Sequence, residues 1–291
     1  MKTRTSLNAL IMFIGLALVF PMQAQVDLPP LSPEGFVKQQ VGFTTVEIEY
    51  SRPSMRGRVI FGELVPFGEV WRTGANKSTK IRFSEDVTLE NHQVPAGSYA
   101  LYTIPGEDEW TIILSKNLDL WGSYGYVKSD DFLRFAVKPV FSDYHFETMT
   151  IDIGELTETS ATIQLMWENT IVRFNLGTKT DAVVMEKLDK LLNNPMVHVG
   201  NNYYGAASYY LRTHRDMDKA LAWVDKAIEI NGKSPWYLQL KAEVLAEKGD
   251  YRGAIKIADE AVVIANQKND EASATISKKT IEKWKSMLSS N

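Results

Sequence analysis

A period of two runs through Thr148-Met149-Thr150-Ile151-Asp152-Ile153. Apolar and polar side chains alternate in this run, so an extended chain would place them on opposite faces. A strand with one apolar and one polar face is typical of an antiparallel sheet that covers a core with one side only. The pattern therefore predicts a half-buried β-strand.

The same rhythm extends in both directions, from Phe43 to about Leu176. Val46-Glu47-Ile48-Glu49-Tyr50 and Lys80-Ile81-Arg82-Phe83 repeat it, as do residues 133–137. Turns rich in proline and glycine separate the runs, because proline presets φ and glycine adopts a positive φ without strain. About eight short strands predict an all-β sandwich or squat barrel over residues 25–176. Within it, Glu168-Asn169 is predicted to form the tip of a hairpin between residues 161–167 and 170–176.

After Gly177 the apolar spacing becomes helical. Thr180 or Asp181 is a suitable N-cap for a helix that ends near Leu192. Residues 215–221 then align with residues 249–255 at an offset of 34, the period of a helix–turn–helix repeat. We therefore predict an all-α helical-repeat domain over residues 177–291, with repeats at about 201–234 and 235–268 and a capping helix at 271–288.

These repeats resemble the tetratricopeptide repeat. The second copy carries small or aromatic residues at the consensus places, and the first copy departs from it at Tyr204, Ser208 and Arg215. The matching residues of the second copy are Ala242, Gly249, Tyr251, Ala254 and Ala261. Such helix pairs stack into a concave surface, so the resemblance implies contact with a peptide or protein partner, or docking onto the β domain.

The N-terminus has the composition of an export signal. Lys2 and Arg4 precede an apolar run at residues 9–20, and Ala24 supplies a small residue before a cleavage site. The run is shorter than a membrane-spanning helix, and a buried N-terminal helix is the alternative interpretation. We expect residues 1–24 to be removed and the mature protein to be secreted to the periplasm or outside the cell.

Composition excludes several classes of function. The chain has 291 residues with no cysteine, which removes disulfides, thiol catalysis and thiolate metal sites. Its 32 basic and 36 acidic side chains give a net charge of −4. No dense basic cluster is visible, so we expect no nucleic-acid partner and no membrane attachment after signal cleavage.

One stretch of the β region is much less generic than the rest. It comprises Ser51-Arg52-Pro53-Ser54-Met55-Arg56-Gly57-Arg58-Val59-Ile60-Phe61-Gly62, then Leu64-Val65-Pro66-Phe67-Gly68-Glu69-Val70-Trp71-Arg72-Thr73-Gly74-Ala75-Asn76, then Val94-Pro95-Ala96-Gly97-Ser98-Tyr99 and Tyr102-Thr103-Ile104-Pro105-Gly106. Together these motifs resemble domain of unknown function 2911, a family of exported proteins of Bacteroidetes-type bacteria. The resemblance covers roughly residues 31–176 and implies no activity, although tetratricopeptide-like helices often follow this domain in the family.

The same stretch holds the candidate binding residues. Arginine suits bidentate binding of a carboxylate or phosphate, and tryptophan can stack on a sugar ring. The stretch therefore suggests a small anionic or glycan ligand. Alternatively, the arginines pin irregular loops by bonding to backbone carbonyls. The candidate residues are Arg52, Arg56, Arg58, Trp71, Arg72, Thr73 and Asn76.

A second aromatic group surrounds Trp121. Trp110, Trp121, Tyr124 and Tyr126 lie near Gly122 and Gly125, whose presence predicts a tightly turning loop. Exposed aromatic side chains on such a loop would grip a sugar or a peptide. The alternative is that the tryptophans fill the core or an edge of the sheet. We include Trp121 among the candidate binding residues.

No catalytic motif is present in the sequence. The four histidines stand in no metalloprotease, phosphate-loop or nucleophile-elbow pattern, so we name no catalytic residue, metal or cofactor. The sequence favours a binding or scaffold protein, with the β domain for a ligand or partner and the helices for protein contact. A hydrolase acting on an acidic cell-surface polymer or glycan, and a purely structural domain, are the alternatives.

Overall fold

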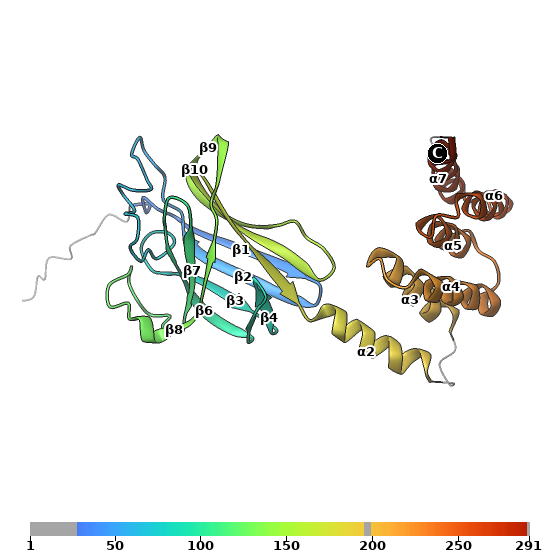
Figure 1. Ribbon diagram of the computed structural model, residues 1–291, viewed down its shortest axis with the longest axis horizontal. Coiled ribbons are helices and arrows are strands. Elements are labelled where there is room, and N and C mark those ends of the chain that lie inside the picture. Colours follow the sequence, from blue (N-terminus) through green and yellow to red (C-terminus); the bar gives the residue numbers. More distant parts are fainter. Residues whose placement is uncertain (1–27, 195–198, 290–291) are drawn as a thin grey trace, which may run out of the picture. The chain divides into compact units, whose positions relative to one another are not determined.

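The computed structural model describes residues 28–194 and 199–289. The chain forms two compact units that divide between Thr178 and Lys179. The first contains two antiparallel sheets and the second contains helices, which confirms the predicted fold class (Figure 1). The predicted signal peptide lies outside the described residues. No helix within the described ranges is long and apolar enough to cross a membrane.

The larger sheet of the first unit has six strands. Every neighbouring pair is antiparallel, and the outermost strand on one side is the first in the chain. In spatial order the strands are β1 (Glu34–Val41), β2 (Thr44–Ser51), β3 (Thr79–Phe83), β6 (Gly97–Ile104), β7 (Trp110–Ser115) and β8 (Asp131–Val137).

The second sheet has four strands. Its two long strands run beside each other and form the most extensive pairing of the unit (Figure 1). In spatial order the strands are β5 (His92–Val94), β4 (Val87–Leu89), β10 (Ser160–Thr178) and β9 (Val140–Gly154). The only helical turn that the structure describes before residue 179 is a 3₁₀ turn at Lys128–Asp130.

One core joins the two sheets. Ile48 and Ile81 of the larger sheet are fully buried in the same apolar cluster as Ile151 and Ile163 of the smaller one. The alternation at residues 46–50 and 148–153 is the cause, because every second side chain of β2 and β9 turns inward. The unit is thus a sandwich of two sheets around a shared core.

β10 contradicts the predicted hairpin. Residues 160–178 form one strand of 19 residues, and Glu168-Asn169 marks an irregularity in its pairing with β9 where a turn was predicted. Glu168 has a φ of 57°, and the amide of Asn169 donates 3.0 Å to the Ser142 carbonyl of β9. The two polar residues therefore stabilise a bulge in the ladder, which local sequence does not distinguish from a tight turn.

β1 precedes the first strand that the alternation predicted. Its residues are exposed on one face and half-buried on the other, because β1 lies at the edge of the sheet. An edge strand of this kind requires little apolar side chain, so Glu34–Val41 lacks a strong period-two pattern. It pairs with the whole length of β2 through the tight turn at Gly42.

Six helices follow in the described part of the second unit. The predicted helix after Gly177 is confirmed, although its N-cap is Lys179 and not Thr180 or Asp181. Each later helix packs against the next one in the chain. Ala227 and Ala261, which are 34 residues apart, are both fully buried between helices. The helices are α2 (Thr180–Leu192), α3 (Gly200–Arg212), α4 (Met217–Asn231), α5 (Pro235–Glu247), α6 (Tyr251–Gln267) and α7 (Glu271–Ser289).

The turns before α4 and α6 are built alike. The Asp216 carboxylate accepts a hydrogen bond of 3.0 Å from the backbone N–H of Lys219, and Asp250 accepts one of 2.9 Å from Gly253. Both aspartates cap the first turn of a helix at positions 34 residues apart. α3 also neighbours α5, and α5 neighbours α7, so alternate helices line one side of the array.

Candidate functional site

The candidate arginines bond mainly to the backbone of their own domain. Arg52, the residue after β2, donates from Nε to the Met149 carbonyl at 3.2 Å and from Nη2 to Thr150 Oγ1 at 2.8 Å, which links the end of β2 to β9. Arg58 donates from Nε and Nη2 to two carbonyls of its own loop, at 2.8 Å and 2.7 Å. Such hydrogen bonds to oxygens of the protein favour the alternative in which the arginines hold irregular loops in place.

Arg56 and Arg72 also lie against backbone. Arg56 donates from Nη2 to the Leu31 carbonyl at 2.9 Å, and Arg72 donates from Nε to the Gly74 carbonyl at 3.4 Å. Arg72 further depends on Gly122, where a Cβ atom would stand 2.4 Å from the guanidinium. The four arginines therefore engage separate partners, and none lines the cleft of the β domain described below.

Trp71 belongs to the aromatic core. Its ring stacks on Trp167 with centroids 5.8 Å apart and an interplanar angle of 19°, and it meets Trp110 edge to face at 6.3 Å. Its Nε1 donates to the Gly74 carbonyl at 3.1 Å. Thr73 is fully buried, with its hydroxyl 3.2 Å from that of Thr103. These two predicted residues thus face the interior.

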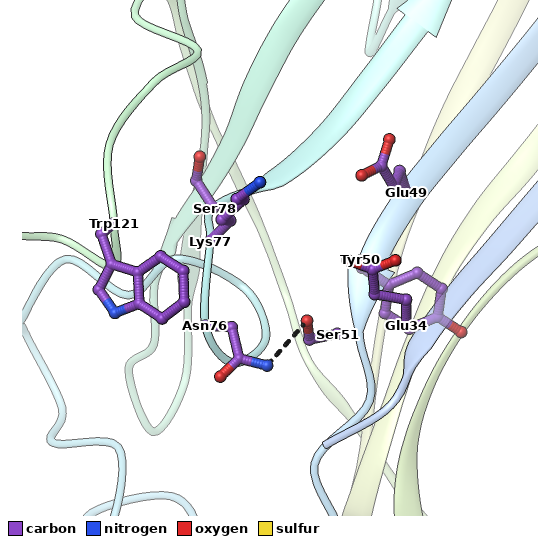
Figure 2. A pocket seen from close by; sticks show the side chains of 8 residues that line it. All are labelled: Glu34, Glu49, Tyr50, Ser51, Asn76, Lys77, Ser78 and Trp121. Carbon is purple, nitrogen blue, oxygen red and sulfur yellow. Dashed lines mark hydrogen bonds between the residues drawn. The ribbon is translucent and has the colours of Figure 1, made fainter. Parts of the chain in front are cut away.

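Two of the predicted residues do come together. Asn76 and Trp121 line a cleft of about 250 Å³, which we call the Trp121 cleft (Figure 2). It lies where β1, β2, the segment before β3 and the loop after β7 meet. Its other lining residues are Glu34, Glu49, Tyr50, Ser51, Lys77 and Ser78.

Sheet register sets the acidic side of the cleft. Glu34 of β1 stands directly opposite Ser51 of β2, and Glu49 lies two residues before Ser51 on the same face. Both glutamates are exposed, on the side of the cleft opposite Trp121 (Figure 2). Sequence reasoning missed both, because a glutamate on the polar face of an alternating strand is the usual sign of a solvated surface.

Backbone pairing fixes the Trp121 side of the cleft. Lys77 and Trp121 form an isolated antiparallel bridge, supported by a hydrogen bond of 3.1 Å from the Gly122 N–H to the Asn76 carbonyl. The Tyr102 hydroxyl donates a hydrogen bond of 3.2 Å to the Gly122 carbonyl. Trp121 nevertheless remains 59% exposed. The loop therefore holds an aromatic side chain that it does not bury.

A half-buried polar network anchors the end of this loop. The Tyr126 hydroxyl donates to the Asp131 carboxylate at 2.7 Å, and Arg134 bonds to both of these residues. Burial, followed by the hydrogen bond with the carboxylate, raises the pKa of Tyr126 to about 12. Tyr126 and Leu120 also pack on Tyr102 in a small apolar cluster beneath the loop.

The charged side chains of the Trp121 cleft have no partner among residues 28–194 and 199–289. No ion pair or side-chain hydrogen bond joins Glu34, Glu49 or Lys77 to another described residue. Asn76 uses its amide N–H groups on Ser51 Oγ at 3.2 Å and on a carbonyl, so its own carbonyl oxygen stays available (Figure 2). The cleft thus combines two free carboxylates, one ammonium group and an indole.

The helical unit contains a second concave surface, which we call the helical groove. It is an open groove of about 390 Å³ along α3, α5 and α7. Lys283 and Glu243 line it, and His214 forms a contact of 2.8 Å with Glu247 there. This is the side of the array on which the alternate helices lie together.

The described histidines do not meet in either a catalytic or a metal-binding arrangement. His145 pairs with Asn169 in the β9–β10 bulge, His214 with Glu247, and His92 stacks on Phe135. Within the described ranges, no group of three or more histidine, aspartate or glutamate side chains is placed to hold a metal ion. The predicted hydrolase alternative gains no catalytic pair from these positions.

Comparison with known proteins yields one match. The family model described as "Protein of unknown function (DUF2911)" matches residues 32–176, which is nearly the whole two-sheet unit. No curated protein and no solved structure matches the chain. The interpretation of the Trp121 cleft therefore rests on its geometry.

Proposed function

Since the β domain of this chain belongs to the DUF2911 family, whose function is unknown, we propose a function from the domain's own site. The protein is an exported binding protein that holds a small ligand in the Trp121 cleft. The basic start and the apolar run at residues 9–20 support export. The cleft supports binding, because it is concave and carries several polar groups.

The exposed Trp121 indole is the observation that carries this proposal. Large aromatic side chains are usually buried, and Trp110 of the same unit is only 1% exposed. Several hydrogen bonds to the backbone hold in place the loop that presents Trp121 to solvent beside unpaired charges. A rigid platform of this kind binds a ligand with little loss of conformational entropy.

A thermal-shift screen tests the proposal. The mature chain would be screened against sugars, phosphates, short peptides and metal salts. A ligand present at a hundred times its Kd should stabilise the domain by about 2.7 kcal/mol. Trp121→Ala should abolish that stabilisation.

Tyr124→Ala is the matched control for the screen. Tyr124 lies on the same loop and is 84% exposed, but it does not line the cleft. It should therefore leave the response to the ligand unchanged. A ligand that stabilises the Trp121→Ala variant as strongly as the wild type would place the binding site elsewhere, and a flat screen would contradict the proposal.

For the helical unit we propose contact with a protein partner through the helical groove. The support is the stacking of tetratricopeptide-like helix pairs, which leaves α3, α5 and α7 on one concave side. A photo-crosslinking residue at position 283, inside the groove, should capture a partner. The same residue at position 268, which is exposed on α6's C-terminal end, should not. Equal capture at both positions would contradict this role for the groove.

A further inference from the structure

The chemistry of the Trp121 cleft narrows the class of ligand, and this step rests on the function proposed above. We infer that the cleft recognises a neutral saccharide ring, with the indole of Trp121 against the C–H face of the ring and the polar side chains on its hydroxyl groups. Three properties of the cleft support this class of ligand: which of its groups are free, what charge they carry and how firmly they are held.

The free groups include both donors and acceptors. Glu34 and Glu49 offer carboxylate oxygens, which only accept hydrogen bonds, and Asn76 offers its carbonyl oxygen. Lys77 offers an ammonium group, which only donates. A hydroxyl group both donates and accepts, so a ring that carries several hydroxyls can satisfy all of these groups together.

An anionic ligand fits the cleft less well. The cleft holds two carboxylates and one ammonium group, so its net negative charge repels an anionic ligand. The arginines that would favour an anion do not line the cleft, and Arg52 is bonded to the Met149 carbonyl and the Thr150 hydroxyl instead. The sequence left an anion and a glycan as possible ligands, and the structure favours the glycan.

An organic cation fits part of the cleft. An indole beside two carboxylates would attract an ammonium ligand by cation–π and charge interactions. Lys77, however, pairs through its backbone with Trp121 and lines the same cleft. Its ammonium group repels a second cation, whereas it can donate to a hydroxyl.

The aromatic platform suits a ring. Sugar rings expose an apolar C–H face on one side, and an exposed indole covers that face while the edge groups remain free for hydrogen bonds. Figure 2 shows the indole on one side of the cleft and Glu34 and Glu49 on the other, with Asn76 and Ser51 between them. A volume of about 250 Å³ in an open cleft accommodates one ring with room for its substituents to leave.

The test measures binding at the Trp121 side chain itself. The indole N–H signal of Trp121 in an NMR spectrum is assigned as the one that Trp121→Ala removes. Methyl glucoside, methyl galactoside, methyl mannoside and N-acetylglucosamine are titrated as neutral probes, glucuronate and galacturonate as anions, and choline as a cation. Titration to about 10 mM reaches ten times a millimolar Kd.

Two charge-removing variants then identify the class by the sign of their effects. For a neutral saccharide, Glu49→Gln and Lys77→Ala should each weaken binding by about two- to fivefold, since each removes a hydrogen-bonding charge. For an anion, Glu49→Gln would tighten binding. For a cation, Lys77→Ala would tighten it. Glu63→Gln, an exposed carboxylate outside the cleft, is the control and should change nothing.

The outcomes separate this inference from the proposed function. A shift of the Trp121 signal by neutral sugars, weakened by both variants and retained in Tyr124→Ala, would support it. A shift caused only by uronates or only by choline would overturn the saccharide class but leave the cleft as a binding site. If none of the three ligand classes shifts the Trp121 signal, the inference is overturned. A flat thermal-shift screen would separately contradict the proposed function.

Discussion

The connection at residues 51–76 and the loop at residues 116–127 use similar side chains in opposite ways. The connection carries Arg52 and Trp71. Arg52 bonds to the Met149 carbonyl and the Thr150 hydroxyl of β9, and Trp71 packs in the aromatic core. The loop carries Trp121 and Tyr124, and it leaves both exposed while its backbone is firmly bonded. Residue type alone therefore does not separate a structural side chain from one that is available to a ligand.

What separates them is whether the side chain already has partners. A guanidinium that bonds to two oxygens of the fold is held against the domain, with two of its five N–H donors already occupied. An exposed indole on a fixed loop makes few contacts within the fold, so its ring is available to a ligand. The comparison predicts large losses of stability from substitutions in the connection and small ones from substitutions at the exposed tip of the loop.

The largest effect is expected from Trp71→Ala. This change removes a ring that stacks on Trp167 and touches Phe61 and Trp110, and it leaves a cavity between them. Truncation of such a tryptophan costs about 3 kcal/mol or more. Urea unfolding followed by far-ultraviolet circular dichroism measures this loss. A loss below about 1 kcal/mol would mean that Trp71 is not part of the core.

Arg52→Ala should cost less, about 2 kcal/mol. The substitution leaves the Met149 carbonyl and the Thr150 hydroxyl without their charged donor and loosens β2 from β9. Arg173→Ala serves as the control. Arg173 is exposed, and its ion pair with Glu155, at 3.8 Å on the surface, contributes little to stability. Equal free energies of unfolding for the two variants would show that Arg52 is not a structural pin.

Tyr126→Phe should cost about 1 kcal/mol, since the Asp131–Arg134 pair remains after the hydroxyl is lost. The pH dependence is more specific. The pKa of Tyr126 is raised from 10.0 to about 12 in the folded protein, so its stabilising effect is complete below pH 10 and is lost as the pH rises from 10 to 12. A fall in stability over that window should be smaller in Tyr126→Phe. Identical pH profiles for the variant and the wild type would contradict this role.

Trp121→Ala should have the smallest effect on stability, within about 0.5 kcal/mol, because the side chain makes few contacts that the fold requires. The same variant is expected to lose ligand binding, so stability and binding should separate at this residue. A stability loss comparable to that of Trp71→Ala would remove the contrast between the two regions and, with it, the reason to regard Trp121 as a binding platform.

Part of the candidate site could be read from the sequence. Asn76 follows a glycine-bearing turn, and Trp121 stands in a short loop with two glycines, so both were predicted and both line the cleft. Arg52, Arg58 and Trp71 were predicted by the same residue-type reasoning but find their partners inside the domain. Their partners are distant in the chain or are backbone groups, and neither kind has a local signature.

The sequence by itself determined the fold class and the family. Alternation in residues 46–50 and 148–153 is a local property, because each side chain's face follows from the pleat of its own strand. The change to helical spacing after Gly177 is local for the same reason.

Tertiary structure alone decided the make-up of the cleft. Glu34 and Glu49 come to lie across from Trp121 only because β1 pairs with β2 in one register and the loop after β7 pairs with Lys77. Tertiary structure also decided that Glu168-Asn169 continues β10 through a bulge, since β9 pairs with residues on both sides of it. In each case the deciding contact joins residues far apart in the chain, and such contacts leave no periodic trace in the amino-acid sequence.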